Sequence, residues 1–341
     1  MKGEIKESVD CSMKTSRSVS LVIPVRNEEQ SLPSLIESIK QQTFEPAEII
    51  IVDGGSVDGT VRVVKEIAGR DPRFRVVEAG PATPGRGRNV GVAAARYDWI
   101  AFTDAGIRLE PDWLAELVRT ADADPSLDVI YGNYEPVVSS FFERCAALAY
   151  VPPKLPRGNG SLRGPSIVSC LMKRNAWARV GGFPDLRAAE DLIFMERIEK
   201  AGLRIGWAPQ ATVWWSLQPS FKKTFRKFAL YSYHNVLADR QKYWHYGIAR
   251  QYLVAIPFLL LGILHSAWWF GVPVAGFILR VARSIWRHRD GREVVWLFNP
   301  LQFALVGAII LAIDLATFVG WGQALKQSST FTSKRETKEN A

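Results

Sequence analysis

The sequence predicts an α/β protein with a mostly parallel sheet and helices on both sheet faces, followed by an interfacial amphipathic helix and transmembrane helices. Between residues 18 and 219, apolar runs of strand length alternate with segments whose apolar residues have helical spacing. Polar clusters stand where the predicted strands end. Further along the chain, two long runs lack any charged residue, which is typical of membrane-spanning helices.

The predicted strands and helices follow one another in regular order. Strand-length apolar runs occupy Val19–Val25, Ile49–Val52, Phe74–Glu78 and Tyr97–Thr103. Helical spacing begins at Ser31 or Leu32 and marks further helices at Thr60–Ala68, at about Asn89–Ala95 and at Leu192–Ala201. This alternation favours parallel strands, because a crossover helix returns the chain to the start of the next strand.

Polar residues follow three of the predicted strands directly. Arg26, Asn27 and Glu28 come after the first strand, Asp53 after the second and Asp104 after the fourth. Ligands of parallel sheets bind at the carboxyl ends of the strands. Asp53 also opens the turn Asp-Gly-Gly-Ser-Val-Asp-Gly-Thr, whose glycines allow the backbone to approach a ligand closely. The sequence therefore predicts a ligand site at this edge of the sheet.

A glycine-rich segment, Gly80–Asn89, carries Arg86 and Arg88 just before a predicted helix. Backbone amides at a helix start and arginine side chains both bind phosphate groups, so this segment is a candidate contact for a diphosphate. Its glycine spacing differs from the dinucleotide fingerprint and it does not follow the first strand, which argues against a nicotinamide enzyme. The sequence also lacks a Walker A motif.

Two adjacent acids, Glu190 and Asp191, precede the helix predicted from Leu192. Carboxylates at a helix N-terminus stabilise the helix dipole, and a carboxylate in a cleft can act as a general base. The residues alone leave both roles open.

The segment Glu135–Gly164, which contains several prolines and glycines, also has two interpretations. It is either an acceptor-side loop or a plain surface loop.

The C-terminal third predicts an integral protein of the cell membrane with a cytoplasmic catalytic domain. Gln251–Leu279 and Val294–Ile313 contain no Asp, Glu, Lys or Arg, and both are long enough to cross a bilayer. The first run is too long for one upright helix, and His265–Trp269 at its centre suits an interfacial turn. A tight hairpin would keep the following basic cluster cytoplasmic. The cluster consists of Arg280, Arg283, Arg287, His288, Arg289 and Arg292.

The domain boundaries follow from these patterns. The prediction is a flexible leader at 1–17, the α/β domain at 18–219, an amphipathic interfacial segment at 220–247, a transmembrane region at 248–325 and a polar tail at 326–341. The transmembrane region holds two or three spans. Three are favoured, and the third would leave the tail outside the cell.

The net charge of +9 is concentrated next to the predicted spans. Residues 220–250 are rich in lysine and arginine, and Phe221, Phe225, Phe228 and Tyr231 recur there with helical spacing. An amphipathic helix on an anionic bilayer has this pattern. The neighbouring spans argue against nucleic acid as the partner of this basic patch. Three scattered cysteines predict no disulfide framework, which suits a cytoplasmic domain.

Five segments together resemble family two of the inverting glycosyltransferases, which have the GT-A fold. They are LVIPVRNEEQSLPSLIESI, VDGGSVDGT, GRGRNVGVAAA, FTDAGIRLEPDWL and MKRNAWARVGGFPDLRAAEDLIFMERIEKAGLRIGWAP, in the family's order over about residues 18–215. The resemblance implies sugar transfer from a nucleoside diphosphate sugar. It does not indicate which sugar, because the family makes polyprenyl-phosphate sugars, glycolipids and polysaccharides with similar signatures.

The resemblance also implies roles for the residues at the strand ends. Pro24, Asn27 and Glu28 would line the nucleotide site. Asp53 would accept a hydrogen bond from the nucleotide base. Asp104 would be the first acid of the family's Asp-x-Asp element, which holds a divalent ion, Mg²⁺ or Mn²⁺, between the two phosphates.

Further implied roles fall on the glycine-rich segment and on the acid pair. Arg88 and Asn89 would lie near the base or ribose and the diphosphate, with Arg86 a further diphosphate contact. Asp191, paired with Glu190, would be the general base. Transfer with inversion needs such a base within hydrogen-bond reach of the acceptor hydroxyl, together with positive charge for the leaving diphosphate.

The chain departs from the family pattern at three positions. Gly54 stands where a second acid often follows Asp53, Gly106 occupies the third position of Asp-x-Asp, and Trp215 replaces a histidine. The last two changes leave Asp104 as the one obvious protein ligand for a metal. Because Mg²⁺ needs few carboxylates when phosphates and water complete its shell, metal dependence stays open. Alternatively, leaving-group charge comes from arginine: Arg86, Arg88 or Arg108.

The segment SLQPSFKKTFRKF lacks the Gln-x-x-Arg-Trp element of the family's processive members, so a single-transfer enzyme is favoured over a polysaccharide synthase. The predicted function is a membrane-bound hexosyltransferase that moves one sugar to a lipid-linked or membrane-proximal acceptor. A catalytically silent scaffold with the same fold is the alternative that the missing metal ligands motivate.

Overall fold

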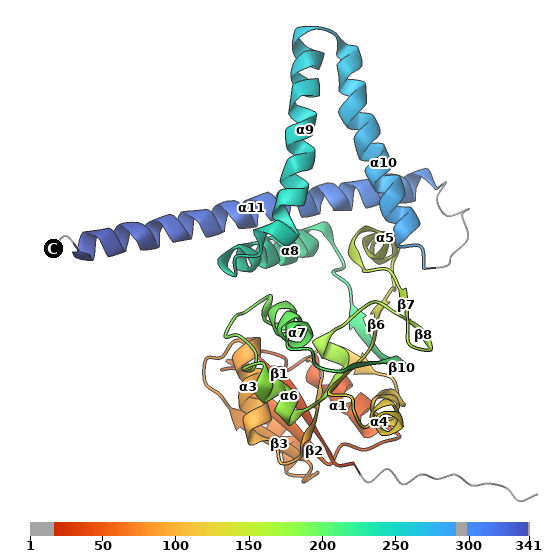
Figure 1. Cartoon of the computed structure of the whole chain (residues 1–341), viewed down its shortest axis with the longest axis vertical. Coiled ribbons are helices and arrows are strands. Elements are labelled where there is room, and N and C mark those ends of the chain that lie inside the picture. Colours follow the sequence, from red (N-terminus) through yellow and green to blue (C-terminus); the bar gives the residue numbers. More distant parts are fainter. Residues whose placement is uncertain (1–16, 291–298, 340–341) are drawn as a thin grey trace, which may run out of the picture.

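The computed structural model describes residues 17–290 and 299–339, with side chains described through residue 327. The predicted leader, apart from Arg17, lies outside the described residues, as does Arg292. Within the described ranges, an α/β domain is joined to C-terminal helices, and one helix hairpin projects away from the body (Figure 1).

The described strands form an eight-stranded sheet and a separate two-stranded sheet. The large sheet has the order β3-β2-β1-β4-β9-β6-β10-β5. Strands β1 to β4 run parallel, as do β6 and β10, whereas β9 and β5 run antiparallel to their neighbours. The predicted mostly parallel sheet is confirmed. The strands are β1 (Val19–Val25), β2 (Glu48–Asp53), β3 (Phe74–Glu78), β4 (Trp99–Phe102), β5 (Ile107–Leu109), β6 (Val129–Val137), β7 (Leu155–Arg157), β8 (Gly160–Leu162), β9 (Cys170–Lys173) and β10 (Ile205–Ser216).

Helices cover both faces of the large sheet and form the C-terminal region (Figure 1). The α-helices are α1 (Leu32–Lys40), α2 (Thr60–Ala68), α3 (Pro84–Ala94), α4 (Trp113–Ala123), α5 (Phe141–Tyr150), α6 (Arg174–Arg179), α7 (Glu190–Lys200), α8 (Phe221–Leu237), α9 (His245–Leu264), α10 (Gly271–Arg287) and α11 (Pro300–Glu339). Short 3₁₀-helices are η1 (Ile167–Ser169), η2 (Gln241–Tyr243) and η3 (Ala267–Phe270).

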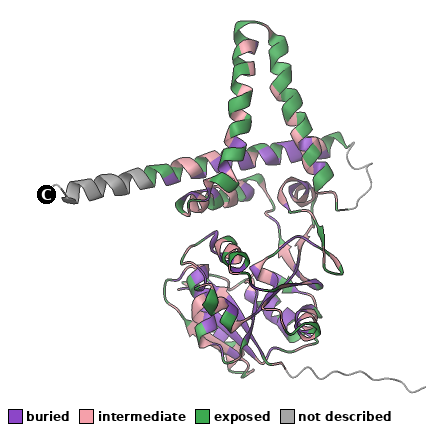
Figure 2. Cartoon of the chain, in the orientation of Figure 1, coloured by how far each residue is buried: buried purple, intermediate pink, exposed green. Residues whose placement is uncertain are grey.

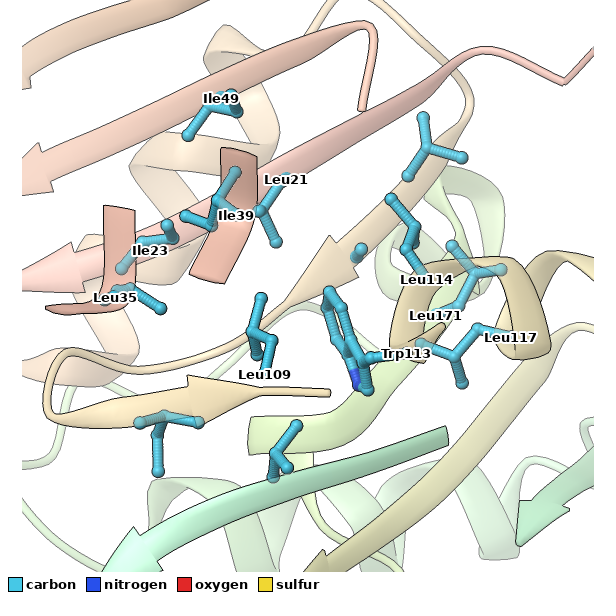
Figure 3. Close-up of a cluster of buried hydrophobic side chains, with 14 of the residues drawn as sticks. Leu21, Ile23, Leu35, Ile39, Ile49, Leu109, Trp113, Leu114, Leu117 and Leu171 are labelled. Carbon is cyan, nitrogen blue, oxygen red and sulfur yellow. The ribbon is translucent and has the colours of Figure 1, made fainter. Parts of the chain in front are cut away.

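Two apolar clusters hold the sheet between its helices. On one face, Leu21, Ile23 and Ile49 pack against α1 and α4, with Trp113 at the centre of the cluster (Figure 3). On the other face, alternate strand residues such as Val22 pack against α3, α6 and α7. The purple core in Figure 2 follows this sandwich. The alternation of strand side chains between two faces explains why the strands are apolar throughout.

Helix α3 begins at Pro84, earlier than the predicted start at Asn89. Thr83 caps it, because Thr83 Oγ1 accepts the backbone N–H of Arg86 at 3.2 Å, and proline suits the first helical turn. Helical glycines permit close packing: a Cβ on Gly91 would lie 2.3 Å from Val22 Cγ1. Glycine lowers intrinsic helix propensity, so the sequence pattern did not predict the helical residues before Asn89.

The C-terminal helices form a third cluster with α5. Helices α9 and α10 make a hairpin whose turn, η3, coincides with the turn predicted at His265–Trp269. Helix α11 crosses the base of this hairpin (Figure 1) and packs on α5 and α8. Two described segments, His245–Leu264 and Pro300–Gln327, are long and apolar enough to cross a membrane by length and composition.

Part of the aromatic side of α8, which the amphipathic pattern predicts to face lipid, has protein neighbours, whereas Phe221 and Tyr231 also stay exposed. The rings of Phe221 and Phe142 lie 5.1 Å apart, as do those of Phe228 and Tyr150 on α5. An apolar helical stripe predicts burial but does not distinguish another helix from lipid. The aromatic stripe of α8 packs in part on α5, and the periodicity of the sequence does not predict this contact.

Candidate active site

A cavity of about 510 Å³ opens at the carboxyl ends of the parallel strands. Pro24, Val52 and Asp104 reach it from β1, β2 and the segment after β4. The first turn of α3 and the residues that begin α7 form further walls. Helix α8 contributes Tyr231 and thus closes the cavity on the side of the C-terminal helices. The cavity therefore lies at the carboxyl ends of the strands, where the sequence predicts a ligand site.

Arg88 joins two walls of the cavity. Its guanidinium donates to Glu190 Oε1 at 2.9 Å and to Asp104 Oδ1 at 2.7 Å, and the side chain is only 3% exposed. Burial opposes its charge, but the carboxylates of Asp104 and Glu190 outweigh this effect and raise the pKa of Arg88. Arg88 therefore stays cationic and fixes α7 relative to β4.

The acid pair at the start of α7 follows a residue in an unusual conformation. Ala189 has φ +68°, in the left-handed region that non-glycine residues seldom occupy. Both acids line the cavity, and Asp191 Oδ1 accepts the N–H of Leu192 at 2.8 Å. Burial raises the pKa of Glu190 and of Asp191, while Arg88 opposes both shifts.

Helix α7 is held at a second point by the segment that leads into the hairpin. Arg240, next to η2, donates from both terminal nitrogens to Glu196, each at 2.9 Å. A bidentate pair of this kind fixes orientation as well as distance. The acid pair thus stands on a helix clamped by Arg88 at its start and by Arg240 in its second turn.

Two predicted binding residues organise the loops at the cavity rim. Asp53, 4% exposed, accepts the backbone N–H groups of Gly55 and Ser56 at 3.0–3.2 Å. Asn27, with φ +58°, accepts the N–H of Val57 at 2.9 Å and so ties the first loop to the second. Neither side chain lines the cavity as it stands. Glu28 and Pro24 do line it.

Arg86 and Asn89 lie apart from the cavity wall. Arg86 is exposed, on the outer side of the first turn of α3. Asn89 binds the turn before α7: its Oδ1 accepts from Trp177 Nε1 at 2.9 Å and from Phe183 N at 2.8 Å, and its Nδ2 donates to Phe183 O at 2.7 Å. Their roles toward a diphosphate or ribose stay predictions.

Arg26, from the polar cluster after the first strand, is an exposed cation at the cavity wall. Other cavity residues were not indicated by the sequence: Arg187 is a second exposed cation, and Leu230, Tyr231 and Asn235 come from α8. Arg187 stands three residues before Glu190, so its place beside the acid pair was available as a signal. The contribution of α8 depends on its packing over the edge of the sheet. A local sequence pattern does not predict packing between segments that are distant in the chain.

Of the positions that the family resemblance assigns to a divalent ion, Asp104 is the one that carries a carboxylate, and it lines the cavity. Gly106, with φ +76°, has no side chain and supplies no carboxylate to an ion held by Asp104. Trp215 pairs with Ile107 of β5 and carries Lys227 over its ring at 5.1 Å. Among the described residues, no group of three or more His, Cys, Asp or Glu side chains suits a metal. These residues fit only an ion held mainly by the diphosphate itself.

Residues 20–181 match the model of glycosyl transferase family 2. The matched segment is just under half of the chain, and over it the chain is similar to that family. Over 116 residues the chain is 38% identical to the putative glycosyltransferase EpsH of Bacillus subtilis, covering 34% of the chain and 33% of the relative. It is 30% identical over 209 residues to the succinoglycan biosynthesis protein ExoA of Rhizobium meliloti, covering 58% and 62%. The chain thus spans less than two thirds of the length of either relative.

A solved structure supports the fold over most of the chain. The mannosyltransferase PcManGT from Pyrobaculum calidifontis, in complex with GDP-Man and Mn²⁺, has a TM-score of 0.55 and 18% identity. The match covers 89% of this chain and 88% of that one. At this identity the likeness establishes the GT-A fold that the sequence predicted.

Proposed function

We propose that this protein is a glycosyltransferase that moves one sugar, with inversion, from a nucleoside diphosphate sugar to a lipid-linked or membrane-proximal acceptor. The observation that carries the proposal is the Arg88 bridge, which brings Asp104 from the sheet and Glu190 from α7 to one cavity beside Asp191. Donor-side and acceptor-side groups of a sugar transfer need this proximity.

Asp191 is the proposed general base. Glu190 is engaged by Arg88, whereas Asp191 lines the same cavity with a pKa that burial raises. A carboxylate with a raised pKa is a stronger base for an acceptor hydroxyl, provided that it is ionised at the working pH. Glu190 is then a positioning residue that holds Arg88 and the start of α7.

The donor diphosphate meets positive charge from Arg26, Arg88 and Arg187 at the cavity wall. A divalent ion, where one is bound, would be held by Asp104 and would stabilise charge on the departing nucleoside diphosphate. The arginines favour the same charge development without the ion. The relative PcManGT was solved with GDP-Man and Mn²⁺, which supports a nucleotide-sugar donor for this chain.

The proposed location is the cytoplasmic face of the cell membrane. The apolar helices His245–Leu264 and Pro300–Gln327 support membrane attachment, and α8 places the cavity directly beneath the C-terminal helices. The succinoglycan biosynthesis relative supports a role in making envelope polysaccharide or its lipid-linked precursors. An acceptor anchored in the bilayer would reach the cavity without leaving the membrane surface.

The deciding experiment compares Asp191→Asn with the unchanged protein in two assays. We expect transfer to fall by roughly 10²–10⁴-fold, the usual contribution of a general base, while donor binding persists. Binding is measured as thermal stabilisation by a panel of nucleoside diphosphate sugars, each with Mn²⁺ or with chelator. Unchanged turnover in Asp191→Asn would refute the base assignment. Failure of every donor to bind the unchanged protein would instead favour a silent scaffold.

A further inference from the structure

We propose that α11 lies flat at the membrane surface and that only the α9–α10 hairpin enters the bilayer. The chain is then attached to one face of the membrane, and Gln327 of α11 stays on the side of the catalytic domain. This inference rests on the membrane attachment proposed above and is independent of the transfer reaction. It replaces the outward-facing tail expected from three spans.

The apolar stretch of α11 is packed along the catalytic domain. Val306 and Ile313 belong to the cluster formed with α5. Further along, Ser232 Oγ of α8 donates to Thr317 O at 2.6 Å, and a Cβ on Gly320 would lie 2.2 Å from Ala229 O. From residue 306 to residue 320 this contact extends over about 21 Å of helix. The depth of α11 in a membrane is therefore fixed by the position of α5 and α8.

Helices α5 and α8 cannot enter hydrocarbon with α11. Lys222, Lys223 and Arg226 are exposed on α8. Helix α5 starts with a capping box in which Glu143 and Ser140 bind each other's backbone N–H groups. Charged side chains in the hydrocarbon core are strongly disfavoured, so a transmembrane α11 would require α8 to separate from it. Separation would also open the cavity that Tyr231 lines.

The outer side of α11 is an exposed apolar stripe. It lies opposite the positions that pack on α5 and α8, since its members recur every three or four residues out of phase with the buried ones. A helix lying in the plane of a membrane surface buries such a stripe among headgroups and upper acyl chains. The stripe consists of Leu301, Ala304, Ala308, Leu311, Leu315 and Val319.

The hairpin is apolar and exposed, but it is short. Leu264 is 81% exposed and Trp268, at the tip, is 90% exposed. The uncharged part of α9, Gln251–Leu264, measures about 21 Å, and that of α10, Gly271–Leu279, about 14 Å, against a hydrocarbon core of about 30 Å. The hairpin thus enters from one side and returns to it.

A buried ionic contact fixes the hairpin to α11 at its base. Arg280 of α10 donates to both carboxylate oxygens of Asp314 at 2.6 and 2.8 Å, and Tyr252 of α9 donates to Asp314 Oδ2 at 2.8 Å. This cluster sits where the uncharged parts of both hairpin helices end. With α11 at the surface, the charges lie at headgroup depth, where they are tolerated.

The test is the side from which single cysteines react in sealed vesicles of known orientation. The background is Cys11→Ser, since Cys145 and Cys170 are buried. Lys222→Cys reports the catalytic side, and Gln327→Cys reports the end of α11's described side chains. We expect an impermeant maleimide to label both variants from the same face. Labelling of Gln327→Cys from the opposite face alone would overturn the proposal, because α11 would then cross the membrane.

Depth measurements separate an in-plane α11 from a tilted one. Nitroxide labels at Leu315→Cys and Leu264→Cys are compared by their collisions with oxygen and with a polar nickel chelate. We expect the Leu315 label at headgroup depth and the Leu264 label well inside the hydrocarbon. Equal depths, or release of the unchanged protein by alkaline carbonate, would also overturn the proposal. Donor binding, assayed on the same preparations, tests the enzymatic proposal separately.

Discussion

Arg88 is the residue whose surroundings explain most of the candidate site. One guanidinium satisfies carboxylates from the sheet and from α7, and it is nearly inaccessible to water. Breaking such a buried pair from one side leaves an uncompensated charge. The site therefore depends on a residue that the sequence marked as a substrate contact and not as a bridge between carboxylates. Its position near the start of α3 lets Arg88 reach both of them.

The pH dependence of transfer tests the environment of Asp191. Burial raises its pKa above the ordinary aspartate value of 3.8, and Asp104 adds to this shift. The base must be ionised, so activity is lost as pH falls through the raised pKa. We expect Asp104→Asn to move this acid limb of kcat to lower pH. The control is Asp98→Asn, whose side chain is 95% exposed, and it should leave the limb in place.

Gly106 offers a test of the weak metal site. With φ +76° and open space around it, this position accepts Asp or Asn more readily than most side chains, because both tolerate left-handed backbone. We expect Gly106→Asp to make donor binding more dependent on Mn²⁺ by supplying a second carboxylate. Gly106→Asn is the matched control without charge. Equal Mn²⁺ dependence in both variants would place this residue away from the diphosphate.

At the scale of elements, the sequence was most informative where a pattern is local. Strand β1, helix α2 and strand β3 have the predicted bounds, because their apolar residues repeat with a clear period. Helix α3 was missed in part, since its glycines weaken the helical signal while allowing close approach to β1 and β2. The role of α8 as a cavity wall arises from packing between distant segments, which periodicity does not encode.

The close packing of α3 predicts a position-dependent cost of adding a methyl group. A Cβ on Gly85 would lie 2.1 Å from Pro184 O, a backbone atom in the segment that leads to the acid pair. We expect Gly85→Ala to destabilise the protein by about 1–3 kcal/mol, the usual cost of overpacking. Gly69→Ala is the control, as its nearest neighbour lies at 3.6 Å. Thermal unfolding with similar losses in both variants would contradict this packing.

At the scale of the whole molecule, the α/β domain and the C-terminal helices are packed together through common helices. Helix α8 lines the cavity on one side and packs on α11 on the other. The third apolar cluster unites α5 with α10 and α11. Composition and hydropathy predict a division of the chain into a soluble part and a membrane part. This division does not reveal that α8 contacts both the cavity and α11.

The contact between Arg240 and Glu196 has a mechanical consequence. It links the neck of the hairpin to the helix that carries the proposed base, so a change in the hairpin's tilt is transmitted to that helix. Bilayers with longer or shorter acyl chains impose such changes of tilt on inserted helices. We expect turnover in reconstituted vesicles to vary with acyl-chain length, and we expect Arg240→Ala to flatten this variation. The lipid would then act as a regulator of catalytic rate as well as the site of attachment.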